Sequence, residues 1–170
     1  NRIRGRKDTR VADRGNGIQL FDGTELVVKG NVVTGARDGI YVSAVEDSLI
    51  EGNRTDEQRY GVHYMYSYRN TLRDNVARNN VGGFALMESR DLVVVGNEAK
   101  DNERVGLLFR DAQNCEIRDN HLARNGQGIF FFSSTDNEIE DNRLVHNDIG
   151  VKVWAGSYRN RVSPNAFVGN

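Results

Sequence analysis

The 170-residue sequence contains a single cysteine, Cys115, and a single proline, Pro164. One cysteine cannot form a disulfide within the chain, so cysteine pairing gives no information about the redox compartment. Proline removes a backbone hydrogen-bond donor from a sheet. Its scarcity therefore suits a chain in which most of the length is paired as strands.

Excess charge and long apolar runs are also missing. The 23 Lys and Arg residues face 24 Asp and Glu residues, for a net charge of -1. This balance argues against a nucleic-acid partner, which requires a basic face. No apolar run approaches the roughly 18 residues that span a membrane, so we expect no direct membrane insertion. The sequence also lacks a phosphate-binding loop and the Gly-Gly-x-Gly-x-Asp repeat of calcium-binding β-rolls.

The sequence has instead a regular repeat of glycine and asparagine. A glycine recurs every 22 or 23 residues, and an asparagine follows each of the first six glycines after 14 residues. A constant period of this length is typical of a solenoid of equal stacked coils. The coils are expected to begin near Gly17, Gly39, Gly61, Gly83, Gly106, Gly128 and Gly150.

Apolar residues mark three strands in each coil. The first and third residues after every repeat glycine are apolar or aromatic, which indicates a strand with one buried face. Further apolar columns lie 11 and 16 residues after the glycine. The pattern predicts an all-β fold, a right-handed parallel β-helix (solenoid) of about seven 22-residue coils with three short strands per coil. We expect residues 1–170 to form a single β-helix domain that is a segment of a longer solenoid, because the sequence opens and ends within a repeat.

Two columns of asparagine are interpreted as structural turns. Asparagine tolerates the left-handed conformation, and its amide can bond to its neighbours in adjacent coils. A ligand site would not recur at every coil. The single cysteine occupies a column of small or apolar residues, so we expect a buried filler there.

The second and fourth residues after each glycine are expected to point outward. This face should be polar, yet it is rich in aromatic residues and methionine, which are the types enriched at protein interfaces. We predict a partner-binding surface; the alternative is a stripe that loops or flanking segments cover. Its residues are Phe21, Tyr41, His63, Met65, Met87, Phe130, Phe132 and Trp154.

Three of these residues suggest a metal site. His63 and Met65 lie two apart on one strand, and Met87 follows Met65 by 22 residues, which places the two methionines side by side in adjacent coils. Imidazole and thioether groups are suitable ligands for copper, above all Cu(I). The alternative is that both methionines are flexible contact residues and that His63 is a polar spacer.

An enzyme is the competing class, because many β-helix proteins process polysaccharides. Lyase, epimerase or hydrolase chemistry needs clustered carboxylates with an acid or base nearby. The acids of this sequence, including Asp38, are spread over the expected turns, and no acid/base pair stands out. We therefore expect a non-catalytic protein, with a carbohydrate-binding or polysaccharide-processing protein as the alternative.

Six segments of the sequence follow one another in a characteristic order: ADRGNGIQLF (Ala12–Phe21), GARDGIYV (Gly35–Val42), RYGVHYMYS (Arg59–Ser67), GFALMESRDLVVVGN (Gly83–Asn97), GLLF (Gly106–Phe109) and AGSYRNRVSPNAFVGN (Ala155–Asn170). In this order they resemble the NosD family, the periplasmic β-helix proteins of nitrous oxide reductase maturation. The resemblance covers essentially the whole chain, and the generic Asn/Gly repeat is its least specific part.

The resemblance implies a periplasmic protein that helps to deliver copper to metal-free nitrous oxide reductase, or to remodel it. The implied partners are this reductase, the subunits of an ABC transporter and a copper-donor lipoprotein. ATP would be hydrolysed by the transporter. The resemblance implies no catalytic residues. The two resembling segments that contain methionine include His63, Met65 and Met87.

Overall fold

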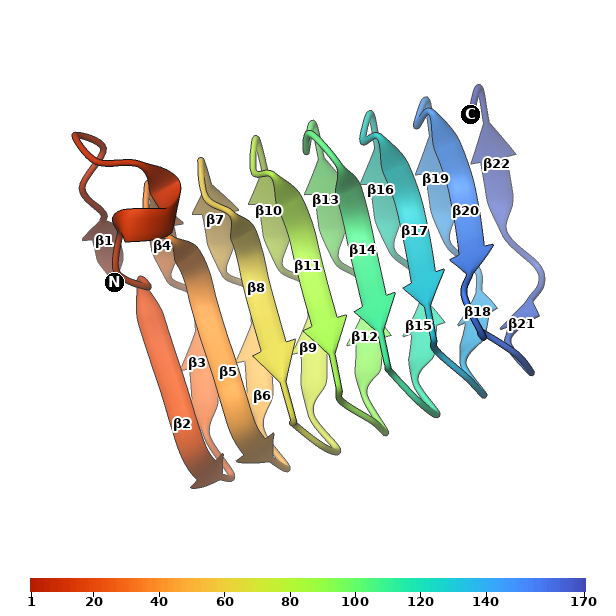
Figure 1. Cartoon of the computed structure of the whole chain (residues 1–170), viewed down its shortest axis with the longest axis horizontal. Coiled ribbons are helices and arrows are strands. Elements are labelled where there is room, and N and C mark those ends of the chain that lie inside the picture. Colours follow the sequence, from red (N-terminus) through yellow and green to blue (C-terminus); the bar gives the residue numbers. More distant parts are fainter.

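The computed structural model describes all 170 residues as one rod of stacked coils (Figure 1). Every coil contributes one strand to each of three sheets, and all strand pairs are parallel. The only helical element is a short 3-10 turn, η1 (Val11–Asp13), in a loop that precedes the first full coil. The predicted parallel β-helix of about seven coils is therefore confirmed.

Each sheet is named here by its position in the coil. Sheet 1 follows the repeat glycines and contains β2 (Ile18–Thr24), β5 (Asp38–Glu46), β8 (Tyr60–Met65), β11 (Gly82–Met87), β14 (Val105–Arg110), β17 (Gln127–Phe132) and β20 (Ile149–Trp154). Sheet 2 contains β3 (Val27–Lys29), β6 (Leu49–Glu51), β9 (Thr71–Arg73), β12 (Val93–Val95), β15 (Glu116–Arg118), β18 (Glu138–Glu140) and β21 (Arg161–Val162). Sheet 3 contains β1 (Arg2–Arg4), β4 (Val32–Thr34), β7 (Arg54–Asp56), β10 (Val76–Arg78), β13 (Glu98–Lys100), β16 (His121–Ala123), β19 (Arg143–Val145) and β22 (Ala166–Val168).

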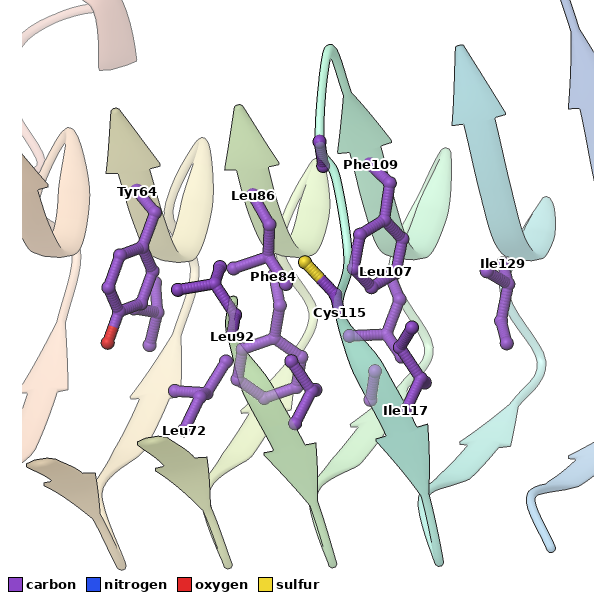
Figure 2. Close-up of a cluster of buried hydrophobic side chains, with 14 of the residues drawn as sticks. Tyr64, Leu72, Phe84, Leu86, Leu92, Leu107, Phe109, Cys115, Ile117 and Ile129 are labelled. Carbon is purple, nitrogen blue, oxygen red and sulfur yellow. The ribbon is translucent and has the colours of Figure 1, made fainter. Parts of the chain in front are cut away.

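The inward columns of the three sheets meet in one hydrophobic core. On sheet 1 the residues predicted to be buried, such as Ile40, Leu86 and Phe131, are fully buried in the middle coils. The prediction was wrong for the end coils, where the core has no further coil to cover it: Ile18, Leu20 and Val151 are only partly buried, and Val153 is 50% exposed. Leu72 and Leu92 close the core from the side of sheet 2, as Figure 2 shows. The core is continuous along the rod because each coil repeats the same apolar positions. It supports the inner face of sheet 1 and leaves the outer face outside the core.

The asparagine column that follows sheet 2 is structural, as the repeat predicts. The side chain of Asn75 donates to the backbone carbonyl of Ile50 at 2.9 Å and to Asn97 Oδ1 at 3.0 Å. Its own Oδ1 accepts from the backbone and the side chain of Asn53, both at 3.0 Å. Equivalent bonds run from coil to coil, so this column satisfies the buried polar groups of the turns and offers no ligand site.

Close packing at the start of sheet 1 explains why the repeat position is glycine. A Cβ added to Gly61 would lie 2.7 Å from the carbonyl oxygen of Gly83 and 2.8 Å from the Cβ of Ala77, and it would collide with Thr55 Oγ1. A Cβ at this position has no room because the chain turns sharply from sheet 3 into sheet 1. The glycine period that defines the coils is thus a steric requirement.

Candidate functional site

The outer face of sheet 1 carries the residues that the sequence singled out. Strand register brings them into two ladders, because equivalent residues of neighbouring strands are paired. One ladder consists of Gln19, Tyr41, His63, Ala85, Leu108, Phe130 and Lys152. The other consists of Phe21, Ser43, Met65, Met87, Arg110, Phe132 and Trp154.

The C-terminal half of this face carries an aromatic cluster of Phe130, Phe132 and Trp154. The three ring centroids are 6.4 Å apart in each pair. Lys152 Nζ lies 4.7 Å from the Trp154 ring centroid, and the Arg110 guanidinium lies 5.7 Å from that of Phe132. Trp154 is 58% exposed. Phe130 and Phe132 are partly buried, so the cluster is a partly exposed aromatic surface with cations at its edge.

Phe21 stands apart from this cluster. It lies in β2, five strand positions from β17 in sheet 1, and is 70% exposed. Between the two ends, the face holds smaller or polar side chains such as Ser43 and Ala85, which are buried. The eight predicted partner-binding residues therefore share one face of sheet 1 but do not form one continuous patch.

The N-terminal half of the face holds a polar network around His63. Arg59 forms a bidentate ion pair with Asp38, through Nε to Oδ1 at 2.9 Å and through Nη2 to Oδ2 at 2.5 Å. His63 Nδ1 lies 3.1 Å from Asp38 Oδ2. The rings of Tyr41 and Tyr60 pack against the imidazole, with centroids 5.2 and 5.1 Å away. These neighbours leave His63 only 6% exposed although its side chain points away from the core.

Two neighbours of His63 Nδ1 bear on which ring nitrogen carries the proton: Asp38 Oδ2 at 3.1 Å and Arg59 Nη2 at 3.2 Å. Asp38 is 1% exposed and its carboxylate is held by two cationic N–H groups, so it is ionised. Arg59 Nη2 could donate to a bare lone pair on Nδ1, but that lone pair would also face the negative Asp38 oxygen at the shorter distance, whereas an N–H group on Nδ1 donates to this oxygen. We therefore assign the proton to Nδ1, which leaves a lone pair on Nε2. His63 Nε2 is buried and has no hydrogen-bond partner.

A carboxylate that orients one imidazole nitrogen and frees the other is the arrangement found behind histidine metal ligands and histidine bases. The sequence interpretation of Asp38 as a turn acid was wrong, because the structure places Asp38 at the start of β5, buried beneath Arg59. The sequence does distinguish this residue, because Asp38 is the only acid among the residues that directly precede the repeat glycines.

The two methionines of the predicted metal site lie beside this network. Met65 in β8 is paired with Met87 in β11, and both are partly buried. Parallel neighbours in a sheet are about 4.8 Å apart. No group of three or more His, Cys, Asp and Glu side chains is arranged to hold a metal ion, so a copper site here depends on thioethers.

Burial raises the pKa of the Cys115 thiol to about 12, so this thiol stays neutral and inside the core.

Asp38 makes the stability of this site dependent on pH. Burial by itself raises the pKa of the Asp38 carboxyl, but the hydrogen bonds from His63 and Arg59 outweigh burial and hold the pKa below its usual range. The ionised carboxylate therefore stabilises the fold above its ordinary pKa of about 4, and this contribution is lost as the pH falls through the lower folded-state value. We expect urea unfolding to show a loss of stability below about pH 4 that is smaller in Asp38→Asn than in the wild type.

The matched control for this measurement is Asp74→Asn, at an exposed turn position. It should keep the pH dependence of the wild type. An Asp38→Asn variant whose stability falls as steeply as that of the wild type between pH 7 and pH 3 would contradict the assignment.

A cavity of about 330 Å³ opens beside His63 on the same face. It is lined by Asn16, Gln19, Arg37, Tyr41, His63 and Met65, together with the Asp38–Arg59 pair. No helix of the structure is long and apolar enough to cross a membrane.

Comparison with known proteins relates the whole chain to one family. The family model described as "Periplasmic copper-binding protein (NosD)" matches residues 1–170. The probable ABC transporter binding proteins NosD of Stutzerimonas stutzeri and of Pseudomonas aeruginosa are 39% and 38% identical to the chain over its full length. The chain spans 42% and 43% of those two relatives.

Among solved structures, the periplasmic alginate epimerase AlgG superposes with a TM-score of 0.74. The match covers 90% of this chain and 46% of the epimerase at 17% sequence identity. At this identity the likeness shows that both proteins have the β-helix fold.

Proposed function

Since this chain belongs to the NosD family of periplasmic copper-binding proteins, we propose that it is a non-catalytic scaffold in the maturation of nitrous oxide reductase. In this role it holds the metal-free reductase while copper is delivered. Its relatives are named as ABC transporter binding proteins. The transporter subunits and a copper-donor lipoprotein are therefore the further partners that we propose.

The aromatic cluster of Phe130, Phe132 and Trp154 carries this proposal. Aromatic rings that gather on one sheet face and remain at least partly exposed are characteristic of contact surfaces. Lys152 and Arg110 place positive charge against the rings of Trp154 and Phe132. The proposed client patch on the reductase is accordingly apolar at its centre and acidic at its edge.

The residues near His63 fit copper as the cargo. His63 Nε2 has a free lone pair and is oriented through Nδ1 by Asp38. Met65 lines the same cavity, and Met87 is its partner on the next strand. One imidazole and two thioethers form a soft ligand set that favours Cu(I). In this proposal His63, Met65 and Met87 hold copper in transit.

The scaffold role is tested by a pull-down with purified metal-free nitrous oxide reductase, with and without Cu(I). We expect the reductase to be retained and no chemical turnover of it by this protein. A copper-loaded reductase serves as the control and should be retained less well. Equal failure to retain either form would contradict the scaffold proposal.

The copper site makes a separate prediction. Changing Met65 and Met87 together to leucine removes two of the three ligands but keeps the apolar volume. We expect the affinity for Cu(I), measured anaerobically by competition with a chromophoric chelator, to fall by about 100-fold or more. His121→Ala, at an exposed histidine of sheet 3, is the control and should bind Cu(I) as the wild type does. An unchanged affinity of the double variant would disprove the copper site and leave the client surface untouched.

A further inference from the structure

The cavity beside His63 contains one positive charge that the protein does not neutralise. The Arg59 guanidinium is paired with Asp38. Arg37 also lines the cavity, is partly exposed, and takes part in no ion pair or side-chain hydrogen bond. The lining therefore carries a net charge of one positive unit, located on a planar guanidinium. Such a group recognises a carboxylate through two parallel hydrogen bonds.

The same cavity offers hydrogen-bond acceptors that have no donor. His63 Nε2 and Asn16 Oδ1 are both buried without a partner, and both residues line the cavity. The Asn16 amide nitrogen donates to Gln19 Oε1 at 3.0 Å, which places the amide oxygen on the other side of the group. Buried polar atoms of this kind are normally satisfied by water or by a ligand. Each of these two acceptor atoms can accept a hydrogen bond from a hydroxyl group of a ligand.

The third feature is an aromatic side wall. Tyr41 lines the cavity, is partly exposed, and packs edge-on against His63. An aromatic ring of this kind offers a flat apolar surface with a polar tip, which suits the face of a sugar ring. At about 330 Å³ the cavity is at the lower end of the size range of small-ligand sites.

We infer that this cavity binds a uronate, a sugar unit with one carboxylate and several hydroxyl groups. The carboxylate pairs with Arg37, and hydroxyl groups donate to His63 Nε2 and Asn16 Oδ1. A neutral sugar leaves the charge of Arg37 unmatched. A sugar phosphate brings a charge of about -1.5 to -2, more than a single free guanidinium balances.

This inference does not rest on the scaffold proposal, although the two share one atom. A lone pair on Nε2 cannot bind Cu(I) and accept a hydroxyl proton at the same time. Uronate and Cu(I) therefore exclude one another at His63. Arg37 and Asn16 belong to the uronate site alone, which allows the two proposals to fail independently.

The test is calorimetric titration of the protein with trimers of mannuronate, guluronate and galacturonate, each compared with its methyl ester. The ester keeps the sugar and removes the charge. We expect at least one of the acid trimers to bind, and its ester to bind about tenfold or more weakly, because a charge-assisted pair is lost. Failure of all three acids to bind, or equal binding of the acid and its ester, overturns the inference.

Two matched variants locate the binding. Arg37→Gln should lower the affinity for the acid trimer by about tenfold or more and leave the affinities for the client and for Cu(I) unchanged. Arg104→Gln removes an arginine from the same position of a later coil, away from the cavity, and should bind the trimer as the wild type does. Equal binding by Arg37→Gln and the wild type overturns the inference. If Arg37→Gln does not fold, as judged by thermal unfolding, the comparison of acid and ester decides.

Discussion

Replacing Phe109 by alanine is expected to lower the free energy of unfolding by about 3–5 kcal/mol. Phe109 in β14 is fully buried and lies between Leu86 and Phe131 in the neighbouring coils. Its ring is stacked on that of Phe131, with centroids 4.7 Å apart. Figure 2 shows it beside Leu86, Leu107 and Cys115 in the middle of the core. Alanine leaves a cavity that two coils border, and the stacked backbones cannot close it.

Urea unfolding of the variant and of the wild type measures this loss. Phe109→Leu should cost less, because it retains most of the apolar volume. Phe21→Ala, at a phenylalanine that is 70% exposed, should change stability by no more than about 0.5 kcal/mol. A loss below about 1 kcal/mol for Phe109→Ala would mean that the coils do not share a packed core.

The fold could be predicted from the sequence because a solenoid turns each sequence column into a physical ladder. The two apolar columns that contain Ile40 and Leu86 are buried throughout the middle coils, and the column of Asn75 and Asn97 is hydrogen-bonded from coil to coil. The alternation of Gly96 with Asp74 in one turn column follows from a left-handed backbone, with φ of +65° and +55°. A residue pattern that repeats in every coil can be recognised from a single sequence.

The His63 network could not be found in this way because it breaks the repeat. Asp38, Arg59 and His63 come from three different columns and two successive coils. Their contact depends on side chains that reach along and across the strands of the outer face. The alternation along the strand predicts correctly that the His63 side chain points away from the core, but it does not predict that this side chain is buried. That burial results from Tyr41 and Tyr60, which fold over the imidazole.

The outer face of sheet 1 is divided between two kinds of chemistry. The His63 network lies on β5, on β8 and at Arg59 directly before β8, and the aromatic cluster lies on β17 and β20. Three strand steps separate β8 from β17 in sheet 1, a distance of about 14 Å at the usual strand spacing. A client protein bound at the aromatic cluster can therefore extend over the methionines as well. This geometry suits a scaffold that positions a client next to its cargo.

Introducing a negative charge into the aromatic cluster is expected to abolish client binding. Phe132→Glu and Trp154→Glu each remove an aromatic anchor and place a carboxylate in the contact. Anchors of this type typically contribute about 2 kcal/mol or more each, so the affinity for metal-free nitrous oxide reductase should fall at least about 30-fold in each variant. The fold should persist, because Trp154 is 58% exposed and Phe132 points away from the core.

The decisive measurement is the dissociation constant of each variant for the metal-free reductase, together with its thermal unfolding. Phe167→Glu is the matched control, since Phe167 is 50% exposed but lies in β22 of sheet 3, away from the aromatic cluster. This control should bind the reductase as the wild type does. The Cu(I) affinity of Phe132→Glu and Trp154→Glu should also stay unchanged, because His63 and Met65 lie in a different half of the face. Retention of client binding by both folded variants would remove the aromatic cluster from the interface and leave the methionine half of sheet 1 as the surface on which the client must dock.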